Sequence, residues 1–336
     1  MNTQKSFLGF SHFPVMLREI IQISNPSEGG LFVDCTFGGG GYSKALLEFP
    51  NTKVIGVDRD SSVLSIAKKL EQKYKNRFQF HQIKFSQIDK ILKGNVDTII
   101  LDLGLSSIQL NNLKRGFSFK SKEKLDMNMG LSDTSAYDVI NNLPEKQLIS
   151  VIRVLGEEKD AKNIVKNIVI ARNKKKITRV NELVDIIEKS KKKNFLSKLN
   201  PSTKTFQALR IFVNKEITEL INGVINASKL LRPGGKMLIV SFHSIEDRII
   251  KYFFSNFSKN KAKPSRYLPE SYGENPSLFE SYSNKIIKPT KNEIQRNNPS
   301  RSAKLRYVTR SKNKFDYPNN LIQKFSNYLE IEGIYV

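Results

Sequence analysis

The sequence predicts an α/β protein, in which a parallel, doubly wound sheet is interrupted by an all-helical insert. In the first hundred residues, short apolar runs alternate with stretches of helical periodicity. That alternation is typical of strands and helices that build one parallel sheet. The pattern stops near residue 109 and returns near residue 213, and we find no convincing strand between these positions.

The first part of the chain predicts four strands separated by helices. We expect strands at residues 31–35, 53–58, 78–83 and 96–102, and helices at 41–50 and 61–75. The second helix shows the clearest spacing, because Val63, Leu64, Ala67 and Leu70 fall on one helical face. These elements are enough for one half of a doubly wound sheet.

The rest of the chain predicts a helical insert and a return to the sheet. In the insert we expect helices at 135–142, 145–172 and 180–192. We then expect a helix over 213–230, a Pro-Gly-Gly turn at 233–235, a strand over 236–241, an antiparallel pair at 285–290 and 303–310, and a mobile loop at 258–284. The predicted domains are therefore 1–108 and 213–336 for the sheet, with 109–212 as an inserted helical domain for substrate recognition.

Composition narrows the class of protein. The net charge of +24 over 336 residues favours a polyanionic partner such as nucleic acid, although solvated lysines alone would give the same number. The single cysteine, Cys35, cannot form an internal disulfide, and the three histidines are scattered, so we expect no metal site. The start of the chain lacks the apolar stretch of a signal peptide, and no run of 18 apolar residues occurs. We expect a soluble cytoplasmic protein without a membrane partner.

A glycine-rich loop follows the first predicted strand. Gly38, Gly39, Gly40 and Gly41 stand between that strand and a helix, where backbone can approach a ligand closely. Asp58 ends the second strand 20 residues after Gly38, and a carboxylate at that place can accept hydrogen bonds from ribose hydroxyls. The loop and this carboxylate predict a cofactor that contains adenosine.

The type of cofactor follows from what the loop lacks. The dinucleotide fingerprint fails, because Ser43 or Lys44 stands where its third glycine belongs, and no P-loop motif occurs. S-adenosylmethionine (SAM) needs no phosphate cradle, but it needs carboxylates near its positive charges. Asp34 and Asp102, at the ends of the first and fourth strands, are placed to provide them. The sequence therefore predicts a SAM site.

Spaced motifs extend over nearly the whole chain. They are His12–Leu17, Asp34–Gly38, Gly56–Asp60, Asp102–Leu110, Arg115–Phe119, Leu125–Met127, Gly156–Glu158, Thr205–Ile211, Ser241–Arg248 and Arg301–Arg306. In this order they resemble the RsmH (MraW) family, which methylates the exocyclic N4 of a cytidine in the decoding region of 16S ribosomal RNA. The resemblance implies a Rossmann-like class I SAM-dependent methyltransferase sheet with an inserted all-helical domain. It also implies that the substrate lies within the small ribosomal subunit.

The resemblance also implies which residues bind the cofactor. Besides Gly38 of the loop, the family's contacts fall on Gly40, Gly41, Tyr42, Asp58, Phe85, Asp102 and Gln109. Two positions depart from the family's pattern: Tyr42 replaces a histidine, and Asn128 replaces an arginine. A side-chain role at the first position, and one positive contact at the second, are therefore in question.

Methyl transfer to a cytidine amine requires an acceptor that polarises its N–H bonds, since the lone pair is delocalised into the ring. The catalytic candidates are Asp102, Ser107 in the loop after the fourth strand, and His243 after the strand over 236–241. That loop holds no aromatic residue to stack on the base, so Phe117, Phe119 and Phe242 are candidates, each with a plain core role as the alternative. The run Glu246-Asp247-Arg248 is either functional or a charge pair at a helix start.

Two basic stretches predict an RNA clamp. Residues 159–193 hold twelve Lys/Arg against four Asp/Glu, and residues 285–314 hold ten against one. The second stretch includes Arg296, Arg301, Lys304, Arg306 and Arg310. Three functions stay open at this point: a cytidine-N4 RNA methyltransferase, a SAM enzyme that acts on another RNA, DNA or a protein amine, and a non-catalytic RNA-binding module. The oligomeric state, monomer or homodimer, is also open.

Overall fold

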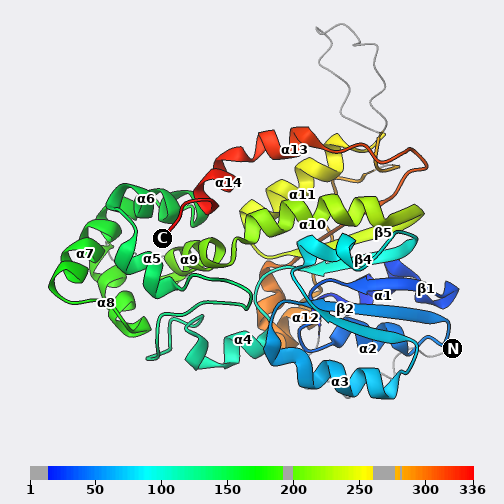
Figure 1. Cartoon of the computed structure of the whole chain (residues 1–336), viewed down its shortest axis with the longest axis horizontal. Helices are drawn as coiled ribbons and strands as arrows, with labels where there is room; N and C mark the ends of the chain where they lie inside the picture. Colours follow the sequence, from blue (N-terminus) through cyan, green and yellow to red (C-terminus); the bar gives the residue numbers. More distant parts are fainter. Residues whose placement is uncertain (1–13, 192–199, 260–276, 281) are drawn as a thin grey trace, which may run out of the picture. The chain divides into compact units, whose positions relative to one another are not determined.

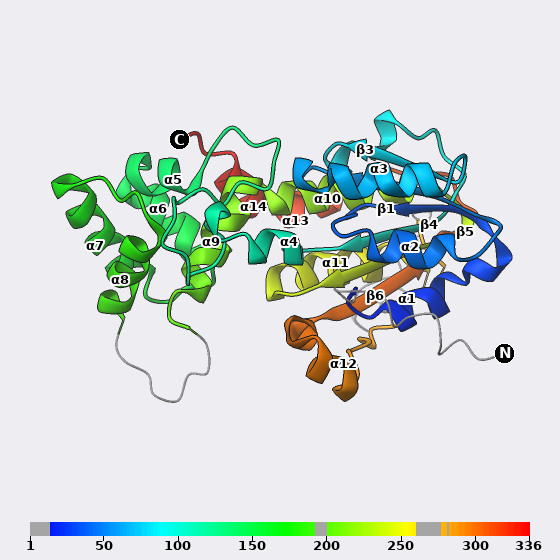
Figure 2. The same cartoon turned by 90° about the horizontal axis from the view of Figure 1, so that it is seen from below.

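The chain folds into two compact units. The computed structural model describes residues 14–191, 200–259, 277–280 and 282–336. We call Met1–Gly104 with Ile221–Ile322 the sheet unit, and Leu105–Leu220 with Gln323–Val336 the helical unit. Figures 1 and 2 show the elements of both units. Among the described helices, none combines the length and the apolar character needed to cross a membrane.

The sheet unit contains one six-stranded sheet in the order β3-β2-β1-β4-β5-β6. Its strands are β1 (Gly30–Asp34), β2 (Thr52–Asp58), β3 (Phe78–Gln82), β4 (Val96–Asp102), β5 (Leu231–Ser241) and β6 (Lys304–Thr309). The first five strands are parallel and β6 is antiparallel to β5. The predicted Rossmann-like α/β class is confirmed. The strand order reverses between β1 and β4, and open sheets of this kind bind ligands at the carboxyl ends of the strands beside such a point.

Helices cover both faces of this sheet, as Figure 1 shows with α1, α2 and α3 on one side and α10 and α11 on the other. The helices of the unit are α1 (Leu17–Ser24), α2 (Gly41–Leu47), α3 (Leu64–Lys73), α11 (Ser244–Asn256) and α12 (Lys291–Arg296). Two more helices, α10 (Glu216–Leu230) and α13 (Asn319–Lys324), run from one unit into the other. The strand interiors between the two layers are apolar, and Phe32, Ile99, Ile100 and Ile239 are at most 1% exposed. Covering both faces explains why these strands read as continuous apolar runs.

At the closing edge of the sheet, one predicted strand is absent. β6 pairs along its length with β5, whereas of residues 285–290 only Ile287 forms a single bridge, to Leu305. Met237–Val240 of β5 are fully buried and need a full partner strand on this side. The 285–290 stretch carries exposed Lys285 and Lys288 and a proline, Pro289, which has no N–H to donate. The predicted antiparallel pair between these two stretches is therefore wrong: β6 pairs with β5, and residues 285–290 form no strand.

The predicted mobile loop at 258–284 falls largely outside the described residues, which omit 260–276 and 281. The described residues at its end are packed into the sheet unit. Leu278 and Phe279 are at most 1% exposed, and the Phe279 ring meets Phe253 and Phe254 edge-on at centroid distances of 5.3 and 5.7 Å. The described residues of this segment form no named helix or strand, as predicted, but they are packed, because Leu278 and Phe279 fill the core beneath α11.

The helical unit contains short helices and, among its described residues, no named strand. Its helices are α4 (Ser107–Asn111), α5 (Ala136–Asn142), α6 (Glu145–Ser150), α7 (Ala161–Lys174), α8 (Val180–Ser190), α9 (Thr203–Asn214) and α14 (Ser326–Glu332). The helix predicted over 145–172 is interrupted after a π-helical turn at Val151–Leu155. Gly156 packs tightly there, since a Cβ would lie 2.5 Å from the Lys204 carbonyl oxygen, and Glu157 has a positive φ of 49°.

The C-terminal segment belongs to the helical unit, not to the sheet unit where the sequence alone places it. The Glu332 carboxylate accepts hydrogen bonds from the backbone N–H of Ile217 at 2.9 Å and of Thr218 at 2.7 Å. These N–H groups belong to the first turn of α10, which has no intrahelical partners for them. A carboxylate from a distant part of the chain therefore caps α10, and no local sequence pattern predicts this contact.

Candidate cofactor-binding site

Asp58 fastens the glycine-rich loop. Its Oδ2 accepts a hydrogen bond from the Gly38 N–H at 2.8 Å, and its Oδ1 accepts one from the Asp60 N–H at 2.9 Å. Burial raises the pKa of this carboxyl, and the two backbone donors oppose that shift. Each carboxylate oxygen can accept more than one hydrogen bond. Asp58 therefore shapes the loop and keeps acceptor capacity for the predicted ribose contact, which stays a prediction.

The loop needs glycine at specific places. Gly40 has a φ of 71°, and a Cβ there would lie 2.9 Å from the Phe37 ring. At Gly41, the first residue of α2, a Cβ would lie 2.8 Å from Pro14. At Gly39, in contrast, a Cβ would meet no atom of the described residues within 4 Å. The loop is thus packed on one side and open beside Gly39, at the N-terminus of a helix, where backbone can face a ligand.

Two carboxyls lie behind this loop, at the ends of β1 and β4. Asp34 is fully buried, and its Oδ2 accepts from the Ser43 hydroxyl at 2.7 Å. Asp102 is half-buried, and its Oδ2 lies 3.2 Å from the Tyr42 hydroxyl. The Oδ1 atom of each carboxyl has no hydrogen-bond partner among the described residues. A buried carboxylate oxygen without a partner is costly, so both point to a ligand that supplies donors or positive charge.

The electrostatics of these carboxyls support the same ligand class. Burial raises the pKa of Asp34 to about 6. Burial raises the pKa of Asp102 to about 8, and the negative charges of Asp34, Glu246 and Glu293 add to that rise. An acidic cluster of this kind, inside a protein of net charge +24, repels phosphate and attracts a cation. The residues fit SAM, whose amino group and sulfonium are positive.

The Phe85 ring packs against α10 at a glycine that leaves space for it. The half-buried ring packs on α10 at Gly223, where a Cβ would lie 2.5 Å from two ring carbons. One face of the ring is therefore covered by helix backbone. Contact of Phe85 with the adenine of the cofactor stays a prediction.

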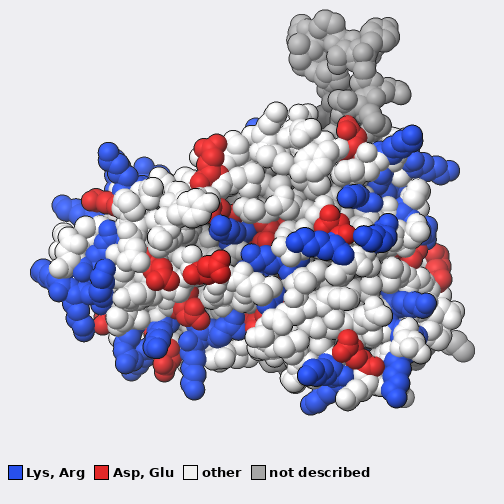
Figure 3. All heavy atoms as spheres, viewed as in Figure 1, with Lys and Arg blue, Asp and Glu red and all other residues white. Residues whose placement is uncertain are grey.

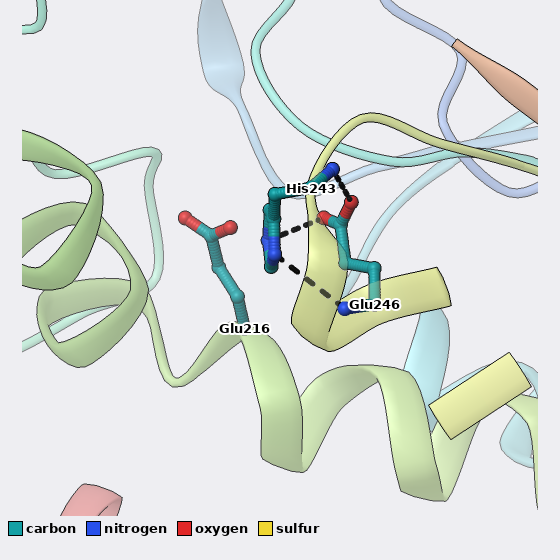
Figure 4. Close-up of side chains that lie close together, drawn as sticks. All are labelled: Glu216, His243 and Glu246. Atoms are coloured by element: carbon teal, nitrogen blue, oxygen red, sulfur yellow. Dashed lines mark hydrogen bonds and ion pairs between the residues drawn. The ribbon is translucent and has the colours of Figure 1, made fainter. Parts of the chain in front are cut away.

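His243 begins α11 as its N-cap, and Figure 4 shows it folded against Glu246. The Glu246 carboxylate accepts from the Phe242 N–H at 2.9 Å and lies 3.0 Å from His243 Nε2. That nitrogen makes no aligned hydrogen bond within the described part of the chain. Glu216, also drawn, belongs to the helical unit, where it pairs with Arg210 at 2.8 Å. The geometry gives His243 and Glu246 a capping role, and a catalytic role of His243 stays a prediction.

Two predicted site residues belong to the helical unit. Ser107 is the first residue of α4, and Gln109 is 5% exposed. The Gln109 side-chain oxygen accepts from the Ser106 N–H at 2.9 Å, while the Ser106 hydroxyl accepts from the Gln109 N–H at 3.2 Å. This capping box holds the start of α4. Roles for Ser107 in catalysis and Gln109 in cofactor binding stay predictions.

The three aromatic candidates differ in their surroundings. Phe117 is buried, 6% exposed, beneath the guanidinium of Arg115, and Phe119 packs edge-on against Phe206, so both have core contacts within the helical unit. Phe242 is half-buried in the sheet unit, 3.5 Å from where a Cβ of Gly104 would stand. Of the three, Phe242 alone lies beside the loop that follows Asp102.

The two departures from the family pattern have local explanations. Asn128 closes a turn, because its amide donates to the Ser132 carbonyl and its Oδ1 accepts from the Gly130 N–H, both at 2.6 Å. Arg115 supplies a positive charge that opposes the effect of burial on the pKa of Asp126. The Tyr42 hydroxyl lies 2.5 Å from the Val15 carbonyl oxygen and 3.2 Å from Asp102. Tyr42 therefore has a side-chain role in this chain.

Sequence reasoning missed Glu293, whose charge faces Asp102 and whose Oε1 accepts from the Met16 N–H at 2.6 Å. A signal was present, because Glu293 is the single acid among ten Lys/Arg in residues 285–314. Sequence reasoning also missed Ser43, which holds Asp34, because it considered this position only as a failed glycine.

The basic stretches differ in how much charge reaches the surface. Lysines and arginines gather over α7 and α8 in the view of Figure 3, and Lys162, Lys166 and Lys189 of these helices are exposed. In the second stretch Arg306 and Arg310 are only 3% and 5% exposed. Arg306 pairs with Asp247 at 2.7 Å, and Arg310 donates to backbone carbonyls such as that of Leu278 at 2.9 Å. The expectation that these two arginines belong to an RNA surface is wrong.

Comparisons with known proteins cover both units of the chain. The model of the MraW methylase family matches residues 9–311. The ribosomal RNA small subunit methyltransferase H of Parvibaculum lavamentivorans is 38% identical over 304 residues, which cover 89% of this chain and 89% of that protein. The protein of the same name from Paramagnetospirillum magneticum is 40% identical over 305 residues, covering 89% and 96%. That from Ehrlichia canis is 40% identical over 302 residues, covering 88% and 99%.

Proposed function

Since the chain belongs to the MraW methylase family, we propose that it transfers a methyl group from SAM to the exocyclic N4 of one cytidine in the decoding region of 16S ribosomal RNA. The family prediction made from the sequence is confirmed, and with it a SAM-dependent ribosomal RNA methyltransferase. The cytidine, its N4 position and the assembled small subunit as substrate are the finer part of the proposal. The substrate implies the cytoplasm as the compartment.

The observation that carries the proposal is Oδ1 of Asp102 at the carboxyl end of β4, which has no hydrogen-bond partner among the residues that the structure describes. SAM supplies an electrophilic methyl group on a positively charged sulfur. The Asp102 carboxylate accepts a hydrogen bond from the target amine, and it takes the proton that the amine loses as the new N–C bond forms. Because burial favours its neutral form, Asp102 needs a nearby cation to ionise at neutral pH. Binding of the cationic cofactor beside this acidic cluster thus favours the ionised form of Asp102, which can accept the proton.

Ribosomal RNA from cells with and without the gene tests this function. We expect mass-spectrometric mapping to show one N4-methylcytidine in 16S RNA that disappears with the gene and returns with the intact gene. Complementation with a gene that encodes Asp102→Asn is the control and should not restore it. An unchanged map would exclude the proposed substrate. A lost methyl group elsewhere in RNA, or on DNA or a protein amine, would support the alternative of a SAM enzyme with another substrate.

The basic face of α7 and α8 supports RNA as the partner. Lys162 and Lys166 are exposed one helical turn apart on α7, where they can contact phosphates. We expect Lys162→Glu with Lys166→Glu to weaken binding to small-subunit RNA by about tenfold or more and to lower the salt slope of log K by about two, one per phosphate contact. Filter binding between low and physiological salt measures both quantities.

The matched control is Lys69→Glu with Lys73→Glu, an exposed pair at the same spacing on α3. This pair changes the net charge of the chain equally. Equal weakening by both double variants would mean that only net charge matters, and it would remove α7 from the RNA surface.

A further inference from the structure

The Tyr42 side chain lies between two oxygen atoms behind the cofactor loop. Tyr42 is 3% exposed, and its ring belongs to the first turn of α2. Its hydroxyl oxygen lies 2.5 Å from the carbonyl oxygen of Val15 and 3.2 Å from Oδ2 of Asp102. All three residues belong to the sheet unit. A buried hydroxyl in such a place is a link between Asp102 and the segment that precedes α1.

One hydroxyl cannot satisfy both oxygens in the same way. A tyrosine hydroxyl has a single hydrogen to donate, and a backbone carbonyl can only accept. When the hydroxyl donates to Val15, it can bond Asp102 only if the Asp102 carboxyl is protonated and donates in turn. When Asp102 is ionised, the hydroxyl hydrogen is drawn to its carboxylate. The bond to Val15 and the charge on Asp102 therefore compete.

We propose that Tyr42 is a positioning residue, whose hydroxyl orients the Asp102 carboxyl for the cofactor and ties its charge state to the Val15–Met16 segment. The proposal rests on the proposed function, since it concerns the same site. It gives the tyrosine at this position a role through Asp102 and not through direct contact with SAM.

The same segment has a second link to the acidic cluster. The Met16 N–H, adjacent to the Val15 carbonyl, donates to Glu293, and Met16 is buried with a positive φ of 54°. A non-glycine residue keeps such a backbone conformation only where its surroundings hold it. The Val15 carbonyl and the Met16 N–H thus bond to two side chains, Tyr42 and Glu293, that both affect the pKa of Asp102.

The titratable groups around Asp102 come from four elements. They are Asp34 of β1, Tyr42 of α2, Glu246 of α11 and Glu293 of α12. The three acids raise the pKa of Asp102, after burial, whereas the Tyr42 hydroxyl lowers it. Tyr42 is therefore the neighbour among these four that favours the ionised form, which a cationic cofactor needs.

Tyr42→Phe tests the proposal, because it keeps the ring and removes the hydroxyl. Calorimetric titration with SAM from pH 6.5 to 9.5 measures Kd at each pH. We expect affinity in the unaltered protein to rise with pH around the pKa of Asp102, about 8. In the variant we expect the midpoint of this pH dependence of SAM affinity to move up by about one pH unit, and Kd for SAM at pH 7.5 to rise about tenfold. An unchanged midpoint would overturn the proposal.

Two comparisons separate positioning from a general structural effect. Tyr74→Phe is the matched control, since the Tyr74 hydroxyl also bonds a carboxylate, Glu48 at 2.8 Å, on the exposed side of the unit. It should leave Kd and midpoint unchanged. In an Asp102→Asn background, Tyr42→Phe should have no further effect on Kd, because its route through the Asp102 charge is gone. A full additional loss in that background would contradict the proposal.

Thermal unfolding without cofactor keeps the two proposals distinguishable. A raised carboxyl pKa costs stability as pH rises from the unfolded value of 3.8 to the folded value, and the cost grows until the folded pKa is passed. With a folded pKa about one unit higher, Tyr42→Phe should lose stability relative to the unaltered protein between about pH 8 and 9. Absence of SAM binding at every pH would refute the proposed function, while a difference in unfolding that does not vary with pH would refute the positioning role.

Discussion

Replacement of Asp102 by asparagine should abolish methyl transfer and leave the chain folded. Asparagine keeps the size of the side chain but cannot take a proton or balance a positive charge, so we expect kcat/KM to fall about a thousandfold or more. The assay is transfer of tritiated methyl groups from SAM to small ribosomal subunits prepared from cells that lack the gene. Near-normal transfer by this variant would remove Asp102 from the mechanism.

A control on the same strand separates chemistry from folding. Asp97 stands at the other end of β4, where its carboxylate accepts from the Leu31 N–H at 2.7 Å and pairs with Arg232. Asp97→Asn should keep transfer within about threefold of the unaltered protein, because it changes the same chemical group far along the strand from Asp102.

The Asp102→Asn variant should also become more stable than the unaltered protein in thermal unfolding, by a margin that grows as pH rises. In the unaltered protein, the Asp102 carboxyl has an unfolded pKa of 3.8 and a folded pKa of about 8. The folded state therefore holds a proton that the unfolded state releases, and stability falls with pH across that window. Asparagine has no such proton, so its advantage should grow from about pH 4 to 8. Active sites often keep such a cost, since function requires the unfavourable charge.

The sheet and the cofactor loop were predictable because their signals are local. Apolar runs, intervening helices and glycines follow from neighbours in the chain, and the carboxyl ends of β1 and β4 bring Asp34 and Asp102 to one edge of the sheet by topology alone. The partners of these acids were not predictable. Ser43 bonds Asp34, and the Tyr42 hydroxyl lies beside Asp102. The charge of Glu293 also acts on Asp102. Packing brings these groups together, and no periodicity in the sequence records it.

The location of the charged side chains was also not predictable, although their number follows from the sequence. A run of basic residues has the same composition whether its members face water or the core. On β6 the alternation of sides puts Arg306 inward and Tyr307 outward, so that the tyrosine is 41% exposed and the arginine is buried. Arg306 can face inward there because α11 supplies Asp247 and the segment that contains Tyr282 supplies a hydroxyl as hydrogen-bond acceptors.

Arg306→Ala should therefore destabilise the fold. The Arg306 guanidinium donates to the half-buried Asp247 at 2.7 Å and to the buried Tyr282 hydroxyl at 2.5 Å, and both bonds are lost when it is removed. We expect the free energy of unfolding in urea to fall by about 1.5–3 kcal/mol, the range for hydrogen bonds to charged groups, because Asp247 keeps Lys304 as a partner. Although burial alone would raise the pKa of Asp247, its bonds to Arg306 and Lys304 lower it. The stability from this pair is thus present above the unfolded pKa of 3.8 and is lost as pH falls through the lower folded value.

In contrast to Arg306→Ala, we expect Arg301→Ala in the same basic stretch to leave the stability of the fold nearly unchanged. Arg301 is exposed in the short turn before β6, so its loss should change the free energy of unfolding by less than about 0.5 kcal/mol. A surface arginine that contacts phosphate would instead lower RNA affinity when removed. If Arg306→Ala weakened RNA binding at unchanged stability, the buried ion pair would not be its role, and the sequence-based assignment of Arg306 to the RNA surface would be right after all. Stability and salt-dependent RNA binding, measured on both variants, therefore decide which of the basic residues belong to the fold and which to the substrate.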